Sequence, residues 1–530
     1  MNSGNGMSSD KNKLRVIVWK PSKYNRDGFV EMFWRGFMPN STVYYIASMV
    51  PLDVDGVPTE VHSVDEYVEP NLKGLELLKN PGVDTVTLVL LVGVQSHQFH
   101  RALDLADFAV RHGSHAVIGG PHPMTCDTTM LQGRGVSFSL SEAELVLPAI
   151  LHDALHGELQ AVYGTEQRWQ RELQSPVLIP PSKKIQRRYV DRSLGVYPAR
   201  GCPYSCTFCS VIKISGQVVR TVPTETIIET LKRAKAAGVK HIVFTSDNFN
   251  KNPIVGELLE AMIAERINLS FFVQCDTQVV KQPELIRLLG RAGCRHMFLG
   301  FESFSRKVLL EVHKTQNHPE DYPKIAQLCH KNSIQVHFSN MIGFRSQTEA
   351  DIWEHLEKLM EVAPDVAWFY IVCMIPGTED YKRYLSEGLI TEPNLDRYDA
   401  SCLVWKHPSI SEQRIQEILL ACYKRFYGIK GTQQRVKKLR AEGFGSAAWT
   451  RGMHRDSFLV RLALWQGMHP MAGGFLRRKL DHVDNYIKER EKRFGFRLVP
   501  LPQNLELSPE DEAFNRNKKL QLPVLEVACA

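Results

Sequence analysis

The sequence predicts an α/β protein with a doubly wound parallel-sheet domain, then a partial (β/α) barrel, then a mainly helical region. A chain of 530 residues is too long for one ordinary hydrophobic core, so several domains are expected. Short β-rich apolar runs alternate with helical stretches in two separate series, which is the pattern of parallel sheets with right-handed crossovers. After about residue 384 this alternation stops, and helical periodicity continues with many aromatic and basic residues.

The first series of strands and helices covers residues 14–157. Three apolar runs are expected to be buried parallel strands, and the stretch between the last two is expected to be a helix that ends at Gly113. Ligands of such sheets bind outside the carboxyl ends of the strands, so the loops after these strands are candidate sites. The three runs are RVIVWK (15–20), TVTLVLLVGV (85–94) and HAVIGG (115–120).

A proline-broken linker, residues 158–193, leads to the second series at residues 194–383. Repeated strand–helix units predict a parallel barrel or partial barrel whose chemistry gathers at the carboxyl ends of the strands. The expected strands are HIVFTSD (241–247), NLSFFVQCD (268–276), HMFLGFES (296–303), QVHFSNMIGF (335–344) and VAWFYIVCMIPGT (366–378).

The two ends of the chain are expected to differ from these domains. Residues 1–13 are polar and lack an apolar core, which predicts a disordered tail and no signal peptide. Residues 384–530 are expected to be a mainly helical substrate or cover region. Within it, residues 457–480 predict two core-packing helices, with a helix on a membrane surface as the alternative. The stretch from Pro500 is expected to be an extended or partly ordered tail.

Composition limits the class of protein. Hydrophobic residues make up 43% and charged residues 23%, as in soluble globular proteins. The net charge of +7 is modest for this length, so no nucleic-acid partner is expected. The eleven cysteines are mostly solitary, which disfavours a disulfide framework. No run of eighteen apolar residues occurs, so no transmembrane segment is expected, and a reducing cytoplasm is the expected location.

The strongest motif is ARGCPYSCTFCS, which presents Cys202, Cys206 and Cys209 on one loop after a short strand. Thiolates are the ligands of iron–sulfur clusters, and this tight spacing lets one loop bind three irons of a [4Fe–4S] cube. One iron then remains open to a chelating amine and carboxylate. The alternatives are a zinc knuckle or three unrelated thiols. A structural zinc site needs four ligands, usually as two pairs, and no second pair follows.

This motif resembles the radical S-adenosylmethionine (SAM) superfamily, in which a C-x3-C-x2-C loop follows the first strand of a partial barrel. The resemblance covers about residues 196–378. Phe208 stands where the family keeps an aromatic residue beside the adenine. The implied chemistry is reductive cleavage of SAM to a 5′-deoxyadenosyl radical, which then abstracts a hydrogen atom from the substrate.

Polar residues after several strands fit the same mouth of the barrel. The resemblance implies that Asp247 contacts the amino group of SAM, and that Glu302 and Ser303 contact its methionine moiety or ribose. Gln274 ends the intervening strand. Each of these residues alone has a plain alternative, since an Asp after a strand is as often a helix cap as a ligand. The neighbouring residues Ser246, Asn248, Gly343 and Gly377 belong to the same set.

The first domain resembles the cobalamin-binding domain that precedes the barrel in one large radical SAM subclass. Gly93 and Ser96 would abut the corrin, and Gly119 and Gly120 would form the loop over the nucleotide side. Residues 141–144 stand where the subclass has a Gly-Glu-Gly-Glu segment, although the glycines are missing. The Asp-x-His-x-x-Gly motif is absent, so a cobalamin without a protein histidine ligand is expected. The alternative is a vestigial domain without ligand.

These resemblances favour a cobalamin-dependent radical methyltransferase. It would act on an unactivated carbon of a natural product, a tetrapyrrole or a polycyclic lipid such as a hopanoid. A flavodoxin or ferredoxin would supply electrons, and peripheral membrane contact would be compatible with a lipid substrate. A second hypothesis keeps the radical but replaces methyl transfer with cyclisation, carbon–carbon coupling or oxidation. A third is an iron–sulfur binding or electron-transfer protein without radical chemistry.

Overall fold

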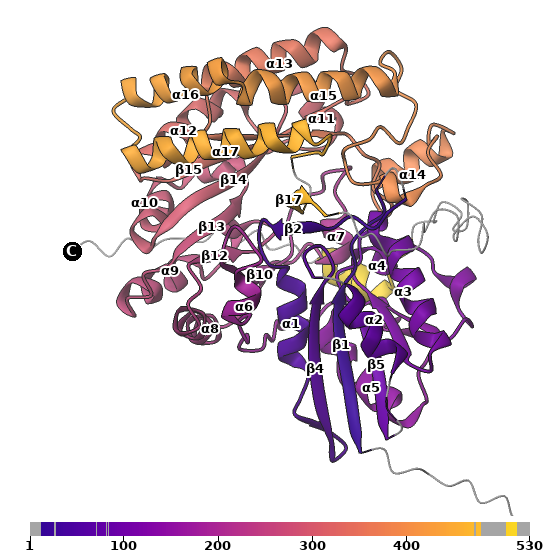
Figure 1. Cartoon of the computed structure of the whole chain (residues 1–530). Helices are drawn as coiled ribbons and strands as arrows, with labels where there is room; N and C mark the ends of the chain where they lie inside the picture. The colour runs from indigo at the N-terminus through magenta and orange to yellow at the C-terminus, as the bar shows by residue number, and fades with distance from the viewer. Residues whose placement is uncertain are drawn as a thin grey trace, which may run out of the picture.

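The computed structural model describes residues 12–25, 28–69, 71–80, 82, 84–470, 473–478 and 505–516. The chain builds two parallel sheets, with a layer of long helices on the second (Figure 1). Most of the tail expected at residues 1–13 lies outside the described residues, but the first strand already begins at Lys13.

The first sheet has seven strands in the order β3-β4-β1-β5-β6-β7-β8. Its chain order reverses direction between β1 and β5, so helices cover both faces and the sheet is doubly wound. Only the short β3 is antiparallel to its neighbour. The strands are β1 Lys13–Lys20, β3 Asp53–Val54, β4 Val57–Asp65, β5 Thr85–Leu91, β6 His115–Gly119, β7 Val136–Ser139 and β8 Val162–Tyr163. The helices are α1 Ser41–Met49, α2 Asn71–Lys79, α3 Phe99–Arg111, α4 Pro121–Thr125 and α5 Ala143–His156.

The second sheet has six parallel strands in the order β16-β15-β14-β13-β12-β9, which is their order along the chain. This order, with β9 and β16 at the two edges, makes an open partial barrel. The strands are β9 Ser193–Val196, β12 His241–Phe244, β13 Ser270–Cys275, β14 Cys294–Glu302, β15 Gln335–Ile342 and β16 Val366–Ile371. The crossover helices are α8 Thr224–Ala236, α9 Val255–Ala264, α10 Pro283–Ala292, α11 Arg306–Glu311, α12 Tyr322–Lys331 and α13 Glu349–Val362.

The predicted fold class is confirmed, because both parallel sheets and the helical region are present. The expected strands of the barrel lie where the sequence predicts them, with ends shifted by a few residues. The sequence left several strands and helices of the first domain unassigned. They are β2 Phe33–Gly36, β3, β4, β7, β8, α1, α2, α4 and α5. The shorter elements are α6 Lys183–Gln186 in the linker, β10 Ala199–Arg200, α7 Val211–Ile214, β11 Arg220–Thr221, and α14 Glu379–Ser386.

The helical pair expected at residues 457–480 is wrong in its second half. One helix, α17 Ala447–Trp465, covers the first half, and β17 Gly474–Arg477 then pairs antiparallel with β2 of the first domain. Glycine makes this approach possible, since a Cβ on Gly474 would lie 2.4 Å from the carbonyl oxygen of Arg35. Residues 479–480 lie outside the described residues.

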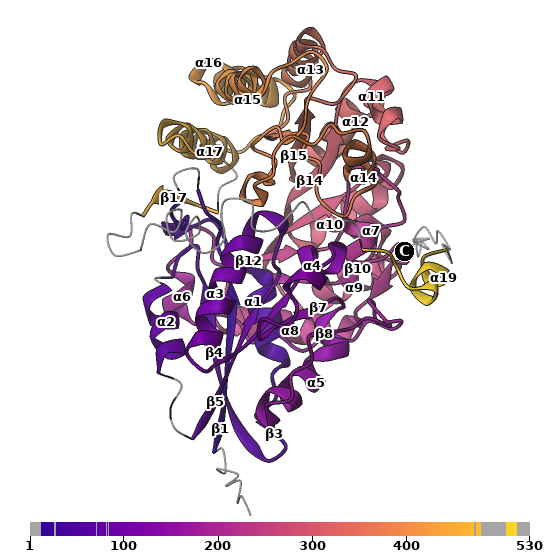
Figure 2. The same ribbon diagram turned by 90° about the vertical axis from the view of Figure 1, so that its right-hand side faces the viewer.

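The expected extended or partly ordered tail contains a helix, α19 Pro509–Arg516, which packs on the linker beside α7 (Figure 2). Asp511 at its start is buried and accepts hydrogen bonds from the Arg168 amide at 3.1 Å and the Arg171 guanidinium at 3.3 Å. Residues 500–504, with which the predicted tail begins, lie outside the described part of the chain.

Two tyrosines of α15 Glu412–Tyr427 cover the edge strand β16. The Tyr423 hydroxyl accepts from the Phe369 amide at 3.1 Å and lies 3.0 Å from the Phe369 carbonyl oxygen, to which it donates. The Tyr427 hydroxyl bonds in the same way to Ala367, at 3.0 and 2.7 Å. The backbone groups of an edge strand have no partner strand, so these hydroxyls replace one. Helix α16 Ile429–Ala441 and α17 complete this layer.

Tyr423→Phe is expected to make local unfolding at the edge strand β16 more frequent, because it removes the hydroxyl that binds the Phe369 backbone. The substitution leaves the buried N–H of Phe369 without a partner, which costs about 1–3 kcal/mol, while its C=O keeps the bond to His469 Nε2 at 3.1 Å. Hydrogen exchange of the Phe369 amide should therefore accelerate markedly, while Tyr163→Phe, which removes a hydroxyl in the first domain, leaves that amide protected. Equal protection of Phe369 in both variants would contradict this role.

Candidate active site

The three cysteines lie on the loop between β10 and α7, next to the carboxyl end of the barrel sheet. The loop leaves β10 through Gly201, whose φ of +107° and close approach to the Val218 carbonyl, 2.1 Å from a built Cβ, require glycine. The Cys202 amide then donates to the Gly216 carbonyl at 3.0 Å, which closes the loop on itself. Thr207 fixes the middle of the loop through its hydroxyl bond to Asp380 at 3.0 Å.

Side-chain amides contact the sulfurs of the cysteine loop. Amide donors reach two of them: Asn248 Nδ2 lies 3.0 Å from Cys202 Sγ, and Gln316 Nε2 lies 3.8 Å from Cys206 Sγ. Such donors hold sulfur ligands in place and tune cluster potentials.

Burial keeps these thiols protonated while no metal is bound. Loss of solvent raises the pKa of Cys209 to about 12, and it also raises the pKa of Cys206, against the nearby charge of Lys314. A catalytic thiolate nucleophile needs the opposite shift. Metal binding, in contrast, deprotonates its own thiol ligands, so this loop has the chemistry of a metal-binding loop.

Asp247 supports the cysteine loop from the end of β12. Its Oδ2 accepts from the Gly201 amide at 2.9 Å, and burial raises the pKa of its carboxyl group. Asp247 is therefore placed directly at the start of the loop. The structure gives Asp247 a positioning role that the sequence did not reveal.

Glu302 ends β14 in a left-handed backbone conformation, with φ of +61°, beside a bulge in the pairing with β15. Its buried carboxylate accepts from Lys314 Nζ at 2.6 Å and from Ser339 Oγ at 2.9 Å. Lys314 Nζ also lies 5.7 Å from the centre of the Phe208 ring. Glu302, Lys314 and Phe208 thus form one group beside the cysteine loop, and Lys314 is a member that the sequence analysis missed.

Ser303 and Gln274 occupy different environments. Ser303 is fully buried, and its hydroxyl accepts from the Ser305 amide at 3.0 Å, so the structure gives it a role in the turn after β14. Gln274 lies on β13, half-buried, and its register neighbour on β14 is Phe298. The structure brings Glu302 and Phe208 together through Lys314, whereas Ser303 belongs to the turn after β14.

On the first domain, the predicted loops meet at the carboxyl ends of β5 and β6. The Val94 amide donates to the Gly119 carbonyl at 3.0 Å, and a Cβ on Gly120 would lie 2.2 Å from the nitrogen of Val94. Ser96 is not directed to this opening, because its hydroxyl lies 3.0 Å from Nδ1 of the buried His122. Burial lowers the pKa of His122 to about 3, so its ring is neutral.

A cavity of about 270 Å³ joins the two domains. Gly93, Gly119 and Gly120 line it from the first domain, and Asp247 and Ser215 line it from beside the cysteine loop. Its inner part is an apolar slot between the first sheet and α5. The residues of this slot are Leu90, Leu91, Val117, Val146, Leu147 and Ile150. None of the lining residues is a histidine.

Four charged residues, of which Arg220 and Glu142 are buried, hold the domains together at this cavity. Arg220, which follows the cysteine loop, makes two bonds to the Glu142 carboxylate, at 2.7 and 3.0 Å. Arg200, which precedes the loop, reaches Glu142 at 3.2 Å and Glu144 at 2.8 Å. Glu142 and Glu144 lie at the start of α5, in the segment that stands for Gly-Glu-Gly-Glu. The segment is recognisable in the sequence, whereas its arginine partners are not.

Comparison with known proteins now defines the class. Residues 196–359 match the Radical SAM superfamily. These residues form a radical SAM domain, and the prediction of this superfamily, with its [4Fe–4S] cluster and SAM as cofactors, is confirmed. The two-domain fold is shared with solved cobalamin-dependent radical SAM enzymes.

TsrM from Kitasatospora setae, a radical SAM methyltransferase solved with cobalamin and a [4Fe–4S] cluster, matches with a TM-score of 0.58 at 16% identity, over 71% of this chain and 79% of TsrM. The cobalamin-dependent SAM radical enzyme OxsB matches with a TM-score of 0.58 at 14% identity, over 86% of this chain and 73% of OxsB. At these identities the likeness concerns the fold.

Two curated relatives are methyltransferases by name. Bacteriochlorophyllide d C-8(2)-methyltransferase of Chlorobaculum tepidum is 24% identical over 352 residues, 64% of this chain and 77% of that protein. Hopanoid C-2 methylase of Rhodopseudomonas palustris is 23% identical over 278 residues, 49% of this chain and 51% of that protein. No helix in the described part of the chain is both long and apolar enough to cross a membrane.

Glu142→Gln is expected to weaken the contact between the domains. Removing one charge of a buried pair leaves the arginines uncompensated, at a cost of about 3–5 kcal/mol. The midpoint of thermal unfolding of the reconstituted enzyme should fall by several degrees. Lys232→Met, which removes the exposed pair with Glu265, is the control and should change stability by less than about 0.5 kcal/mol. Equal midpoints for the two variants would refute this role of Glu142.

Proposed function

We propose that this protein is a cobalamin-dependent radical SAM C-methyltransferase that modifies an unactivated carbon of a small molecule. One observation carries the proposal: a single cavity is lined by the predicted cobalamin loops on one side and by residues beside the cysteine loop on the other. A methyl donor in the first domain would thus lie next to the site where the radical forms.

The residues present fit both cofactors. Three half-buried cysteines supply thiolate ligands, and the buried Oε1 of Gln316, beside Cys206, has no hydrogen-bond partner among the described atoms. In the cavity, the buried Oε2 of Glu144 likewise has no partner in the described part of the chain. That oxygen is an acceptor for a donor such as a ligand amide. The apolar slot, with small residues at its mouth, suits the nucleotide side of cobalamin.

When bound, the cluster and SAM supply the 5′-deoxyadenosyl radical, and cobalamin supplies the methyl group. The chain's own residues hold these groups and exclude water. Cys202, Cys206 and Cys209 bind the cluster, and Asp247 fixes the loop that carries them. Phe208 offers its ring to the adenine, while the Glu302–Lys314 pair presents one negative and one positive charge to the amino-acid part of SAM. Gln274 and Ser303 belong to the SAM side of the site. Ser96 supports the loop on the corrin side through its hydrogen bond with His122.

The partners follow from this chemistry. The substrate is a small molecule, with tetrapyrroles, polycyclic lipids such as hopanoids and other natural products as the classes to test; the relatives act on molecules of the first two kinds by name. A one-electron reductant such as a flavodoxin or ferredoxin would reach the half-buried cysteine loop. Such a reductant places the enzyme in the cytoplasm, and a lipid substrate would require contact with a membrane surface.

The test of methyl transfer is anaerobic purification with cobalamin supplied, then assay of iron, sulfide and cobalt. We expect four irons, four sulfides and one cobalt per chain. With a tetrapyrrole or hopanoid substrate, label from the methyl group of SAM should enter the product. A full cluster without cobalt would overturn the methyltransferase proposal and leave the radical enzyme. Cobalt with an unlabelled but altered product would favour the second hypothesis, a cyclisation, coupling or oxidation.

Cys206→Ala is expected to abolish the cluster and the release of 5′-deoxyadenosine, because two thiolates do not hold a [4Fe–4S] cube in place. Cys294→Ala, which removes a thiol buried in β14 away from the loop, is the matched control and should keep both. Iron content and absorbance of the reduced and oxidised protein provide the measurement. Cys206→Ala with a wild-type cluster would contradict the ligand assignment.

A further inference from the structure

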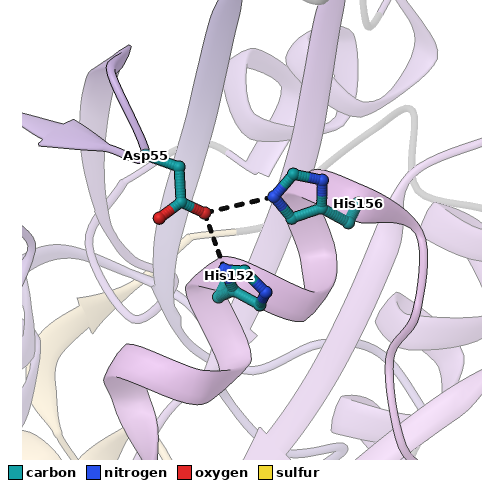
Figure 3. A group of neighbouring side chains, drawn as sticks. All are labelled: Asp55, His152 and His156. Atoms are coloured by element: carbon teal, nitrogen blue, oxygen red, sulfur yellow. Dashed lines mark hydrogen bonds and ion pairs between the residues drawn. The ribbon is translucent and has the colours of Figure 1, made fainter. Parts of the chain in front are cut away.

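A second group of metal-binding side chains lies on the first domain, at the far end of α5 from the cavity. His152 and His156 project from the last turns of α5, and Asp55 projects from the turn between β3 and β4 (Figure 3). Asp55 Oδ2 lies 2.6 Å from His152 Nδ1 and 3.1 Å from His156 Nε2. One ligand atom from each residue lies within 4.8 Å of the others.

The local fold explains how the three side chains converge. The histidines are four residues apart, so they share one face of the helix, one turn apart. Asp55 and Gly56 form the two-residue turn of the β3–β4 hairpin, with φ of +51° and +81°. Asp-Gly is a preferred sequence for such a turn. The turn therefore accounts for Asp55, but it does not account for two imidazoles directed at one carboxylate oxygen.

We propose that Asp55, His152 and His156 form a surface site for a divalent transition-metal ion such as Zn²⁺. Two imidazoles and one carboxylate are a common ligand set for zinc, and a fourth position remains for water. The side chains are about half exposed, at 45%, 53% and 47%, so an ion enters without displacing packed atoms. The site is separate from the cysteine loop and does not depend on the proposed methyl transfer.

The expected role is binding rather than hydrolysis. The segment His152-Asp153-Ala154-Leu155-His156 has the spacing of the zinc-protease helix motif, in which an acid after the first histidine acts as general base. Asp153 does not serve in that way here, because its carboxylate accepts from the Tyr163 hydroxyl at 2.7 Å. An ion at this site would instead join the β3–β4 hairpin to α5, the helix whose first half lines the cavity.

The experiment uses the full chain with its cluster already assembled, so that the cysteine loop is occupied, and titrates Zn²⁺ alone by calorimetry. The wild type should bind one more zinc than Asp55→Asn or His152→Ala at equal concentration. Asn-Gly suits the same turn, so Asp55→Asn keeps the hairpin and removes only the charged ligand. His62→Ala, which removes a histidine paired with Glu60 elsewhere on the sheet, is the control and should bind zinc as the wild type does.

Each lost ligand should weaken binding more than about tenfold, since even residues behind the ligands contribute 10–100-fold. Cu²⁺ is a second probe: its paramagnetic resonance spectrum should show coupling to two nitrogens in the wild type and to one in His152→Ala. Zinc binding that is the same in Asp55→Asn, His152→Ala and His62→Ala would overturn the proposal. So would a copper spectrum without nitrogen coupling.

Discussion

The buried ion pairs between the two domains are the interaction on which the rest of the site depends. Arg200 and Arg220 stand at the two ends of the cysteine loop, and both bind glutamates at the start of α5. Charges buried in this way are costly unless they are paired, so the arginines fix the distance between the domains as well as the loop. These ion pairs help to hold the carboxyl ends of the two sheets facing each other.

The same arrangement explains why the cavity is both apolar and poised for polar ligands. Its walls come from the ends of β5 and β6 and from α5, whose side chains are aliphatic. At its rim, one carboxylate oxygen of Glu144 binds Arg200, and the other has no hydrogen-bond partner in the described structure. A ligand with amide groups meets an acceptor there, while its bulk remains out of water. Radical chemistry benefits from such dryness.

The sequence predicted the parts of the fold that depend on local pattern. The buried parallel strands appear in the sequence as continuous apolar runs, and the cysteine loop appears as a compact motif. Both therefore lie where the sequence predicts them. Contacts between distant segments were not predictable. Lys314 meets Glu302 only because the chain returns after α11, and Arg220 meets Glu142 across 78 residues and two domains. The pairing of β17 with β2 also joins distant segments. In addition, a strand of four residues is too short to show a clear alternation of apolar and polar residues.

Ser303 and Ser96 show a further limit of motif-based inference. The family resemblance suggests that both residues contact a cofactor. In the structure, however, each hydroxyl forms a hydrogen bond with a neighbouring residue. A sequence gives the position of a hydroxyl but not its partner. Glu302 shows the reverse case, because its left-handed backbone conformation directs the carboxylate to Lys314, and nothing in the sequence announces that conformation.

The pairing of β17 with β2 also has a consequence for biosynthesis. β2 leaves the ribosome early, but its partner strand is made only after the whole barrel and helices α15 to α17 have been translated. At 5–20 residues per second, the edge of β2 waits on the order of a minute without its partner. The first domain is therefore completed last, and the nascent chain carries an unpaired strand edge for most of its synthesis, a time when a chaperone would have its greatest effect.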